Sequence, residues 1–228
     1  MLAKKLMALC ATPILALAVP SSLQAADNAT EAAKTISEAR TTLSNFLSDP
    51  DMKWIRSHFP RAKAILIVPV QGKGGFIFAG SGGVGVFLLK DSKGNWSQPA
   101  FYKLAAVSVG LQAGGEKSEV LFFVQSQKGV DSFLSKSFKF GAEASVAAGP
   151  VGQGAKSSTA DVLSFSRSKG AFAGASFDGT SVKPASDLNK AFYNKPASPV
   201  DILVRGTVKS EGANALREDL AKVGVKAK

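Results

Sequence analysis

The chain has 228 residues, of which 45% are hydrophobic and 20% are charged, and its formal net charge is +11 at pH 7. This length fits one large all-β or α+β domain, or two small ones, with a sizeable core, and the positive charge favours polyanionic partners. A single cysteine and a single histidine exclude a disulfide framework and a histidine-rich or thiolate metal site within one chain.

Residues 1–25 have the layout of a secretory signal peptide. Lys4 and Lys5 precede a mostly apolar stretch over residues 6–19, and small and polar residues follow it. The apolar stretch is shorter than the about 20 residues that a membrane-spanning helix needs. We expect this segment to be removed, which leaves a mature chain without cysteine. Export without disulfides suits a bacterial periplasm or an association with the outer membrane.

Residues 26–60 are expected to form an N-terminal helical segment. Over residues 27–47, alanines and larger apolar residues recur at three- and four-residue spacing with charged residues between them, which predicts an amphipathic helix. The breaker sequence Ser48-Asp49-Pro50 ends this helix. A second short helix is expected over residues 51–58.

After Pro60 the pattern changes to short apolar runs separated by turn residues, which predicts a β-sheet. The loop at residues 91–95 is typical of a hairpin. The candidate strands are residues 62–70, 75–80, 85–89, 100–112, 120–126, 138–148, 162–166 and 171–177.

Helices are predicted to return at residues 129–134, 185–192, 199–203 and 211–223. Residues 211–228 are expected to be a C-terminal helix and basic tail. We therefore predict an α+β fold with a curved antiparallel β-sheet or sandwich-like core, an amphipathic N-terminal helix and peripheral C-terminal helices.

Half of the fourteen residues over 72–85, GKGGFIFAGSGGVG, are glycine. Part of this run matches G-x-G-x-x-G, but a strand and a turn follow it instead of the helix that would bind a pyrophosphate. A near match to a phosphate-binding loop at residues 149–157 has its lysine one position out of register. We interpret the glycines as the turn between two apposed strands, residues 76–79 and 84–89. No nucleotide or other cofactor is expected.

His58 is the only histidine, so Ser-His-Asp catalysis would have to use it, and the sequence does not support that role. It lies beside a proline and two aromatic residues, and no nucleophile elbow occurs in the chain. We interpret it as a surface or capping histidine. The carboxylate pairs Glu116/Glu119 and Glu218/Asp219 lie in polar turn or helix settings that do not favour an acid/base pair. The sequence therefore predicts no enzymatic activity and no catalytic residue.

Basic and aromatic side chains alternate in MKWIRSHFPRAK, residues 52–63. Trp and Phe can enter the headgroup boundary of a bilayer, while each nearby Lys or Arg adds about 1 kcal/mol against anionic lipid. The alternative is that the apolar side chains of this segment dock a short helix onto the sheet. The candidate lipid-binding residues of the segment are Lys53, Trp54, Arg56, Phe59, Arg61 and Lys63.

Six ordered blocks between residues 62 and 208 resemble the SYLF-domain family of lipid-binding proteins. They are AKAILIVPVQGKGGFIFAGSGGVG, GNWSQPAFY, VLFFVQSQKGVDSFL, SVAAGPVGQGA, SFSRSKGAFAGASFDG and NKAFYNKPASPVDIL. The resemblance implies a non-enzymatic lipid-binding domain over residues 61–210, whose eukaryotic relatives bind phosphoinositides through a basic surface and an amphipathic N-terminal helix. It adds Lys73 to the candidate lipid-binding residues.

The expected partner is an anionic surface of phospholipid or lipopolysaccharide, because Ser81 stands where many eukaryotic relatives have arginine. The expected function is that of an exported, non-enzymatic lipid-binding protein that docks through its basic region, residues 52–103. The alternative is a cell-envelope structural or assembly protein, whose exposed strands pair with an envelope protein partner. Nucleic acid is not expected as a partner, and the mature chain has no predicted transmembrane helix.

Overall fold

A computed structural model describes residues 21–69, 76–77, 82–105, 117–151, 159–168, 171–173 and 177–226. Its helices are α1 (Ser21–Ser48), α2 (Lys53–His58), α3 (Gln127–Leu134), α4 (Ser186–Tyr193) and α5 (Asn214–Lys226), with the short helical turns η1 (Pro50–Met52), η2 (Phe59–Arg61), η3 (Asp201–Arg205) and η4 (Glu211–Ala213). Its strands are β1 (Ala64–Val68), β2 (Phe76–Ile77), β3 (Gly82–Leu89), β4 (Ala100–Ala105), β5 (Lys117–Val124), β6 (Phe138–Lys139), β7 (Val146–Ala148), β8 (Val162–Ser168), β9 (Ala171–Ala173) and β10 (Ser181–Pro184).

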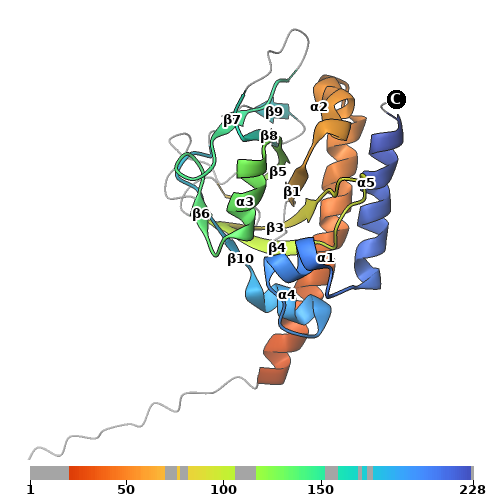
Figure 1. The fold of residues 1–228 in the computed structure, drawn as a ribbon, viewed down its shortest axis with the longest axis vertical. Helices are drawn as coiled ribbons and strands as arrows, with labels where there is room; N and C mark the ends of the chain where they lie inside the picture. The colour runs from red at the N-terminus through yellow and green to blue at the C-terminus, as the bar shows by residue number, and fades with distance from the viewer. Residues whose placement is uncertain are drawn as a thin grey trace, which may run out of the picture.

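The strands form one curled sheet in the order β6-β10-β4-β3-β1-β5-β8-β7, with β2 paired to β5 and β9 paired to β8. Neighbouring strands are antiparallel except β7 and β8, which are parallel. Figure 1 shows α1, α2 and α5 together on one side of this sheet and α3 on the other. The predicted α+β class is confirmed, with a single mixed sheet in place of a sandwich.

The sheet separates two hydrophobic cores. Along the central strand β1, Ala64, Leu66 and Val68 belong to the core on the α3 side, whereas Ile65 and Ile67 belong to the core on the α1 side. Alternate side chains of a strand point to opposite faces of a sheet, so every residue of β1 is buried. An uninterrupted apolar strand of this kind needs cover on both faces.

Aromatic rings dominate the core on the α3 side. Phe133 of α3 stacks on Phe87 of β3 with 4.1 Å between the ring centroids, and its carbonyl oxygen accepts a hydrogen bond of 2.5 Å from the Tyr102 hydroxyl. Phe122 of β5 stacks on Phe140 at 5.1 Å. The contacts of Phe133 fix α3 against this face of the sheet.

Helix α1 covers the opposite core with the apolar stripe that the sequence predicts. Ala32, Ile36, Ala39, Leu43 and Phe46 are each at most 4% exposed. The stripe is therefore part of the folded core, and the expected docking of an amphipathic helix on a membrane does not apply to it in this conformation. Small alanines on this stripe allow the helix to approach the sheet closely.

Helix α5 also lies closer to the core than a peripheral helix would. Its Leu216 and Leu220 are fully buried in the same cluster as the stripe of α1. The C-terminal helix therefore completes the α1 side of the molecule, and Glu218 and Lys222 are exposed on its outer face.

The glycine-rich hairpin between residues 76–79 and 84–89 was predicted with the wrong partner. β2 pairs with β5 and not with β3. Phe76 of β2 is opposite Ser118 of β5, two residues before Val120, which pairs with Val68 of β1. Glycines indicate where a chain turns, but they do not indicate which strand the next segment joins. Lys73 and residues 78–81 lie outside the described residues.

Gly85 of β3 is required by the close approach of β1. A Cβ atom at this position would lie 2.9 Å from the carbonyl oxygen of Ile67 and 2.8 Å from a methyl group of Val68. At least one glycine of the run therefore serves strand packing.

Candidate functional site

The apolar part of the predicted lipid-binding segment packs into the protein. Ile55 and Phe59 are fully buried, and the Phe59 ring lies 5.8 Å from that of Trp96. Trp54 is half-buried, with its ring stacked on His58 at 4.1 Å and its edge contact to Phe123 at 5.4 Å. The docking alternative is thus confirmed for Ile55 and Phe59. The expected insertion of Phe59 into a bilayer is corrected, because its ring does not reach the surface.

Arg56 joins α1 to α2. Its Nη1 donates hydrogen bonds to the carbonyl oxygens of Leu47 at 3.0 Å and Asp49 at 2.5 Å, just where α1 ends. A cation at the C-terminal end of a helix satisfies free carbonyl groups and interacts favourably with the helix dipole. Arg56 therefore has a structural role in addition to its charge.

Three other predicted residues, Lys53, Arg61 and Lys63, are exposed on α2, η2 and the start of β1. None of them forms an ion pair within the described part of the chain. Lys93, at the tip of the hairpin between β3 and β4, is also exposed and lacks an ion pair there. We call Lys53, Arg61, Lys63 and Lys93 the basic surface.

Lys90 attaches that hairpin to η2. Its Nζ donates to the carbonyl oxygens of Phe59 at 3.1 Å and Pro60 at 2.8 Å, and it lies 5.1 Å from the centroid of the Trp96 ring. Burial lowers the pKa of Lys90. The contact holds Lys93 and Lys63 on the same side of the molecule, along a second groove of about 790 Å³ that both residues line.

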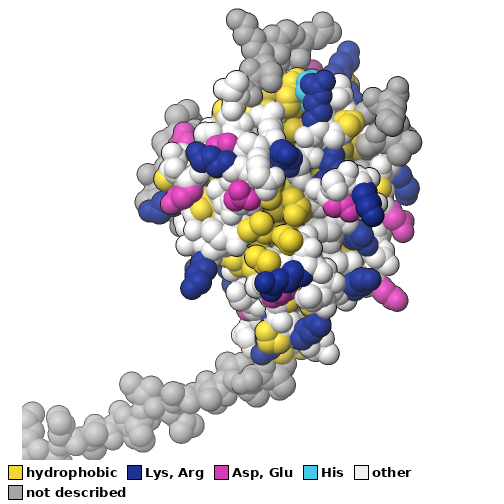
Figure 2. Space-filling view, viewed as in Figure 1, with side chains coloured by type: hydrophobic (Ala, Val, Ile, Leu, Met, Phe, Trp, Pro, Cys, Tyr) yellow, Lys and Arg dark blue, Asp and Glu magenta, His cyan; other side chains and the backbone are white. Residues whose placement is uncertain are grey.

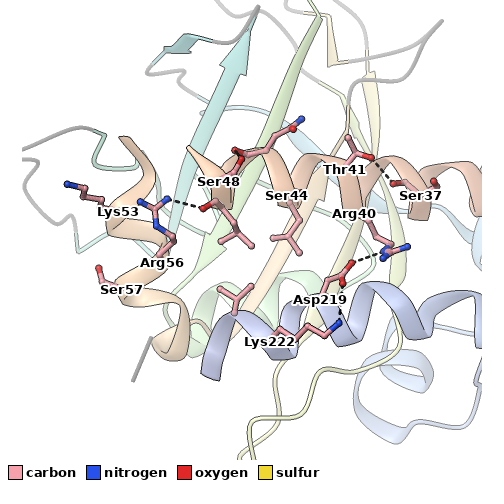
Figure 3. Close-up of a pocket in the computed structure, with 14 residues that line it drawn as sticks. Ser37, Arg40, Thr41, Ser44, Ser48, Lys53, Arg56, Ser57, Asp219 and Lys222 are labelled. Atoms are coloured by element: carbon pink, nitrogen blue, oxygen red, sulfur yellow. Dashed lines mark hydrogen bonds and ion pairs between the residues drawn. The ribbon is translucent and has the colours of Figure 1, made fainter. Parts of the chain in front are cut away.

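A larger groove of about 1140 Å³ lies between α1, α2 and α5 (Figure 3). We call it the α1–α5 groove. One end is bounded by an ion pair between Arg40 Nε and Asp219 Oδ2 at 2.7 Å, which Lys222 approaches to 4.0 Å. The residues that line it are Ser37, Arg40, Thr41, Leu43, Ser44, Asn45, Leu47, Ser48, Lys53, Arg56, Ser57, Asp219, Lys222 and Val223.

Sequence reasoning identified Lys53 and Arg56 but missed the rest of this groove. The remaining cations, Arg40 and Lys222, come from α1 and α5, which are far apart in the sequence. One local signal was present: Ser37, Thr41, Ser44 and Ser48 recur at four- and three-residue spacing, which places hydroxyl groups along one face of a helix.

The family profile described as "Ysc84: Las17-binding protein actin regulator" matches residues 105–223, which is more than half of the 228-residue chain. The chain belongs to the Ysc84 family. The family assignment agrees with the SYLF-domain resemblance of the sequence blocks. Helix α5 lies inside the matched Ysc84 region up to Val223, whereas α1, α2 and the basic surface precede the region.

Curated relatives extend the match beyond the Ysc84 region. Protein YSC84 of Saccharomyces cerevisiae is 33% identical over 141 residues, which cover 58% of this chain and 30% of that protein. SH3 domain-containing YSC84-like protein 1 of Homo sapiens is 30% identical over 209 residues, which cover 89% of this chain and 59% of that protein. The chain thus spans between 30% and 59% of the length of these relatives.

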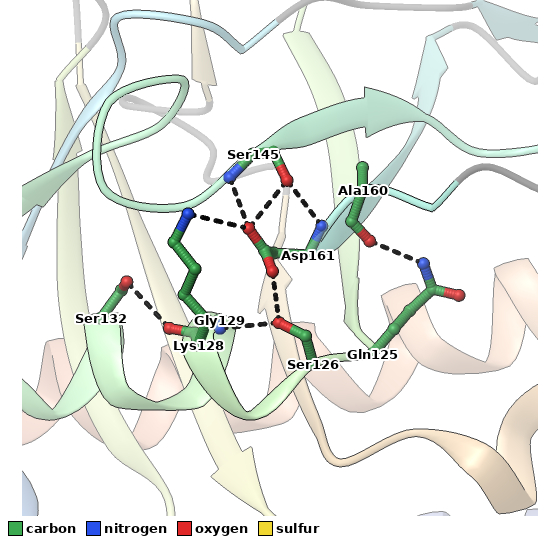
Figure 4. Close-up of polar contacts among 8 residues, drawn as sticks. All are labelled: Gln125, Ser126, Lys128, Gly129, Ser132, Ser145, Ala160 and Asp161. Carbon is green, nitrogen blue, oxygen red and sulfur yellow. Dashed lines mark hydrogen bonds and ion pairs between the residues drawn. The ribbon is translucent and has the colours of Figure 1, made fainter.

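Within the Ysc84 region, Asp161 is the centre of a polar cluster (Figure 4). Its Oδ1 accepts a hydrogen bond of 2.5 Å from the Ser126 hydroxyl, and its Oδ2 accepts from the backbone N–H and hydroxyl of Ser145 at 2.9 and 2.7 Å. The Ser126 hydroxyl also accepts from the Gly129 N–H at 2.9 Å and so caps α3. The cluster therefore ties α3 to the start of β8.

The Asp161 cluster makes the stability of this Ysc84 family member depend on acid pH. Burial raises the pKa of Asp161, but the hydrogen bonds from Ser126 and Ser145 outweigh it and hold the pKa at about 2, below the usual 3.8. A carboxyl group with a lowered folded-state pKa stabilises the fold above its unfolded pKa and loses that contribution as the pH falls.

We expect the free energy of unfolding to fall by about 2 kcal/mol more in the parent protein than in Asp161→Asn between about pH 5 and pH 2. Urea unfolding across this range measures the difference. The exposed control Asp131→Asn keeps Asp161 and should lose as much stability as the parent. A loss in Asp161→Asn as large as the parent's would contradict the assignment.

A second polar cluster fastens α1 to the sheet. Glu119 of β5, whose side chain is 13% exposed, accepts hydrogen bonds from the Thr42 hydroxyl at 3.1 Å and from Asn45 Nδ2 at 3.0 Å. Its other carboxylate oxygen pairs with Arg167 of β8 at 3.1 Å. Three elements therefore meet at one carboxylate.

The described residues contain no group of three or more His, Cys, Asp or Glu side chains that could hold a metal ion. Among the helices in the described ranges, none has an apolar run long enough to cross a bilayer. His58 Nδ1 lies 3.0 Å from the carbonyl oxygen of Trp54, within α2, which is the place expected for a capping histidine.

Proposed function

We propose that this protein is an exported, non-enzymatic lipid-binding protein that associates with anionic membrane lipid, either phospholipid or lipopolysaccharide, through the basic surface. The observation that carries this proposal is the set of exposed cations on α2, η2, the start of β1 and the β3–β4 hairpin that form no ion pair within 4 Å in the described part of the chain. Figure 2 shows dark-blue Lys and Arg side chains at the top of its view, over α2. Exposed cations without an ion-pair partner are attracted to the negatively charged headgroups of an anionic membrane.

The proposed contact is electrostatic. The stripe of α1 and the side chains of Ile55 and Phe59 are buried, so insertion of apolar side chains contributes little in this conformation. Each exposed Lys or Arg adds about 1 kcal/mol near an anionic leaflet, and salt screens this attraction. Binding should therefore depend strongly on ionic strength.

Two features support the export part of the proposal. The first 19 residues carry the charged and apolar regions of a signal peptide. Cleavage after residue 25 would shorten α1 by the five residues from Ser21. Among the α1 side chains that the structure describes, the buried apolar ones begin at Ala32, so the proposed mature chain keeps all of them.

The name of the family favours a second candidate, because it describes a Las17-binding protein and actin regulator. The corresponding proposal for this chain is an envelope structural or assembly protein that acts through a protein partner. Actin does not carry over to an exported protein, and the candidate rests on protein binding alone.

A vesicle co-sedimentation experiment tests the first proposal. The triple variant Arg61→Glu/Lys63→Glu/Lys93→Glu is expected to bind phosphatidylglycerol-containing vesicles at least about a hundredfold more weakly than the parent, because three contributions of about 1 kcal/mol are lost. All three side chains are exposed, so the fold should be unaffected. Raising the salt to about 1 M should release the parent protein as well.

The matched control is Lys136→Glu/Lys183→Glu/Lys190→Glu, which reverses three exposed charges on the α3–β6 connection, β10 and α4. This control should retain most of the binding. Equal pelleting with pure phosphatidylcholine vesicles, or an equal loss in the two triple variants, would contradict docking through the basic surface. Absence of pelleting with any vesicle would leave the protein-partner candidate in its place.

A further inference from the structure

The α1–α5 groove combines three kinds of surface. Its floor is apolar, with Leu43 and Leu47 from α1 and Val223 from α5. Its α1 wall carries hydroxyl groups, and cationic side chains lie at both ends (Figure 3). An occupant that matches all three surfaces has a negative charge, hydrogen-bonding oxygens and a short apolar portion.

The charge of the groove is strongly unbalanced. Arg40, Lys53, Arg56 and Lys222 line it, against the single carboxylate of Asp219. Asp219 already pairs with Arg40 at 2.7 Å, so it does not neutralise the cations at the α2 end. This arrangement attracts an anion, and the guanidinium and ammonium groups are the usual donors to phosphate.

The hydroxyl groups along α1 are suited to the uncharged part of such a ligand. The Thr41 hydroxyl donates to the Ser37 carbonyl and the Ser48 hydroxyl to the Asn45 carbonyl, which leaves their oxygens free to accept. Ser44, between them, is exposed, and its hydroxyl group makes no hydrogen bond within the described part of the chain. Small hydroxyl side chains also leave room above the apolar floor.

We propose that the α1–α5 groove binds one anionic glycerophospholipid, with the phosphate at the α2 end beside Lys53 and Arg56, the glycerol and ester oxygens along the hydroxyl row, and the first methylene groups on the apolar floor. This inference rests on the proposed lipid-binding function and adds a discrete site to it. A free phosphate ion would use only the cations and leave Leu43, Leu47 and Val223 in contact with water. The apolar floor therefore favours the lipid.

The test uses the full chain and dihexanoyl phosphatidylglycerol below its micelle concentration, with binding followed by calorimetry. We expect saturable binding of one lipid per chain. The double variant Lys53→Gln/Lys222→Gln should weaken it at least about tenfold, because the groove loses two of the four cations that line it. The control Lys136→Gln/Lys190→Gln removes the same charge from exposed sites outside the groove and should bind as the parent does. Arg56 and Arg40 are left unchanged, because both hold helices together.

A steric variant separates the groove from the surface charge. In Ser44→Leu, the larger side chain fills the space above the apolar floor, so the variant should no longer bind the short lipid. Leucine favours helix, so the melting temperature of the variant should equal that of the parent. Inorganic phosphate and glycerol 3-phosphate, tested in parallel, should bind at least about tenfold more weakly than the lipid. Equal binding of phosphate and lipid, or unchanged lipid binding in Ser44→Leu, would overturn the proposal.

Failure of this proposal is distinguishable from failure of the proposed function. If Ser44→Leu still pellets with anionic vesicles as the parent does and the short lipid shows no saturable binding, the groove is excluded while membrane docking stands. If the short lipid binds but vesicles are not pelleted, the site stands and docking through the basic surface is excluded.

Discussion

Replacing Glu119 by alanine is expected to lower the free energy of unfolding by about 3 kcal/mol, because the change leaves the charge of Arg167 without its partner in a mostly buried position. The same change removes the acceptor for Thr42 and Asn45, which hold α1 on the sheet. Urea unfolding followed by circular dichroism measures the loss. The exposed carboxylate of Glu218 provides a matched control, and Glu218→Ala should change stability by less than about 0.5 kcal/mol.

A double replacement distinguishes an unpaired charge from lost packing. Glu119→Leu/Arg167→Leu removes both charges, and apolar replacement of a whole buried pair is often neutral or stabilising. We expect it to be more stable than Glu119→Ala. If the single and double variants are equally unstable, the loss comes from Thr42 and Asn45 and not from the unpaired guanidinium.

Gly149→Ala is expected to cost about 3 kcal/mol, at the upper end of overpacking effects. A Cβ atom at this position would lie 2.2 to 2.6 Å from three carbon atoms of the Phe165 ring. The ring cannot move freely, since it also contacts Trp54 with centroids 5.8 Å apart. Thermal and urea unfolding, with tryptophan fluorescence as the probe, test this expectation.

The compensating change is Phe165→Leu, which removes the ring that the new methyl group meets. In a double-mutant cycle, Gly149→Ala should cost less in the Phe165→Leu background than in the parent, by more than about 1 kcal/mol. Additive effects would show that the methyl group is accommodated by a backbone shift elsewhere.

Local patterns in the sequence predicted most of the secondary structure. The stripe of α1 follows helical periodicity, and the loop at residues 91–95 contains Gly94 with φ of +87°, as a tight hairpin requires. Residues 138–148 were predicted as one strand, but a turn at Gly141, φ +87°, divides them into β6 and β7. β10 was not predicted, because its four residues include a proline and only one buried apolar side chain.

The candidate site was harder to predict, because it depends on which faces the fold covers. Composition placed Trp54 and Phe59 in the same basic and aromatic segment, but only the packing of α2 on the sheet decides that Phe59 is buried and Lys53 is exposed. The groove requires α1, α2 and α5 to meet, and no local pattern contains that information.

The burial of β1 on both faces also has a consequence for how the chain folds. β1 pairs with β3 along one edge and with β5 along the other. One of its faces is covered by α1 and by the C-terminal helix α5. These contacts join residues that are far apart in the sequence, and such topologies fold slowly. Without the residues from Asn214 onward, the α1-side core would lack Leu216 and Leu220, so we expect this core to close only after α5 has been synthesised.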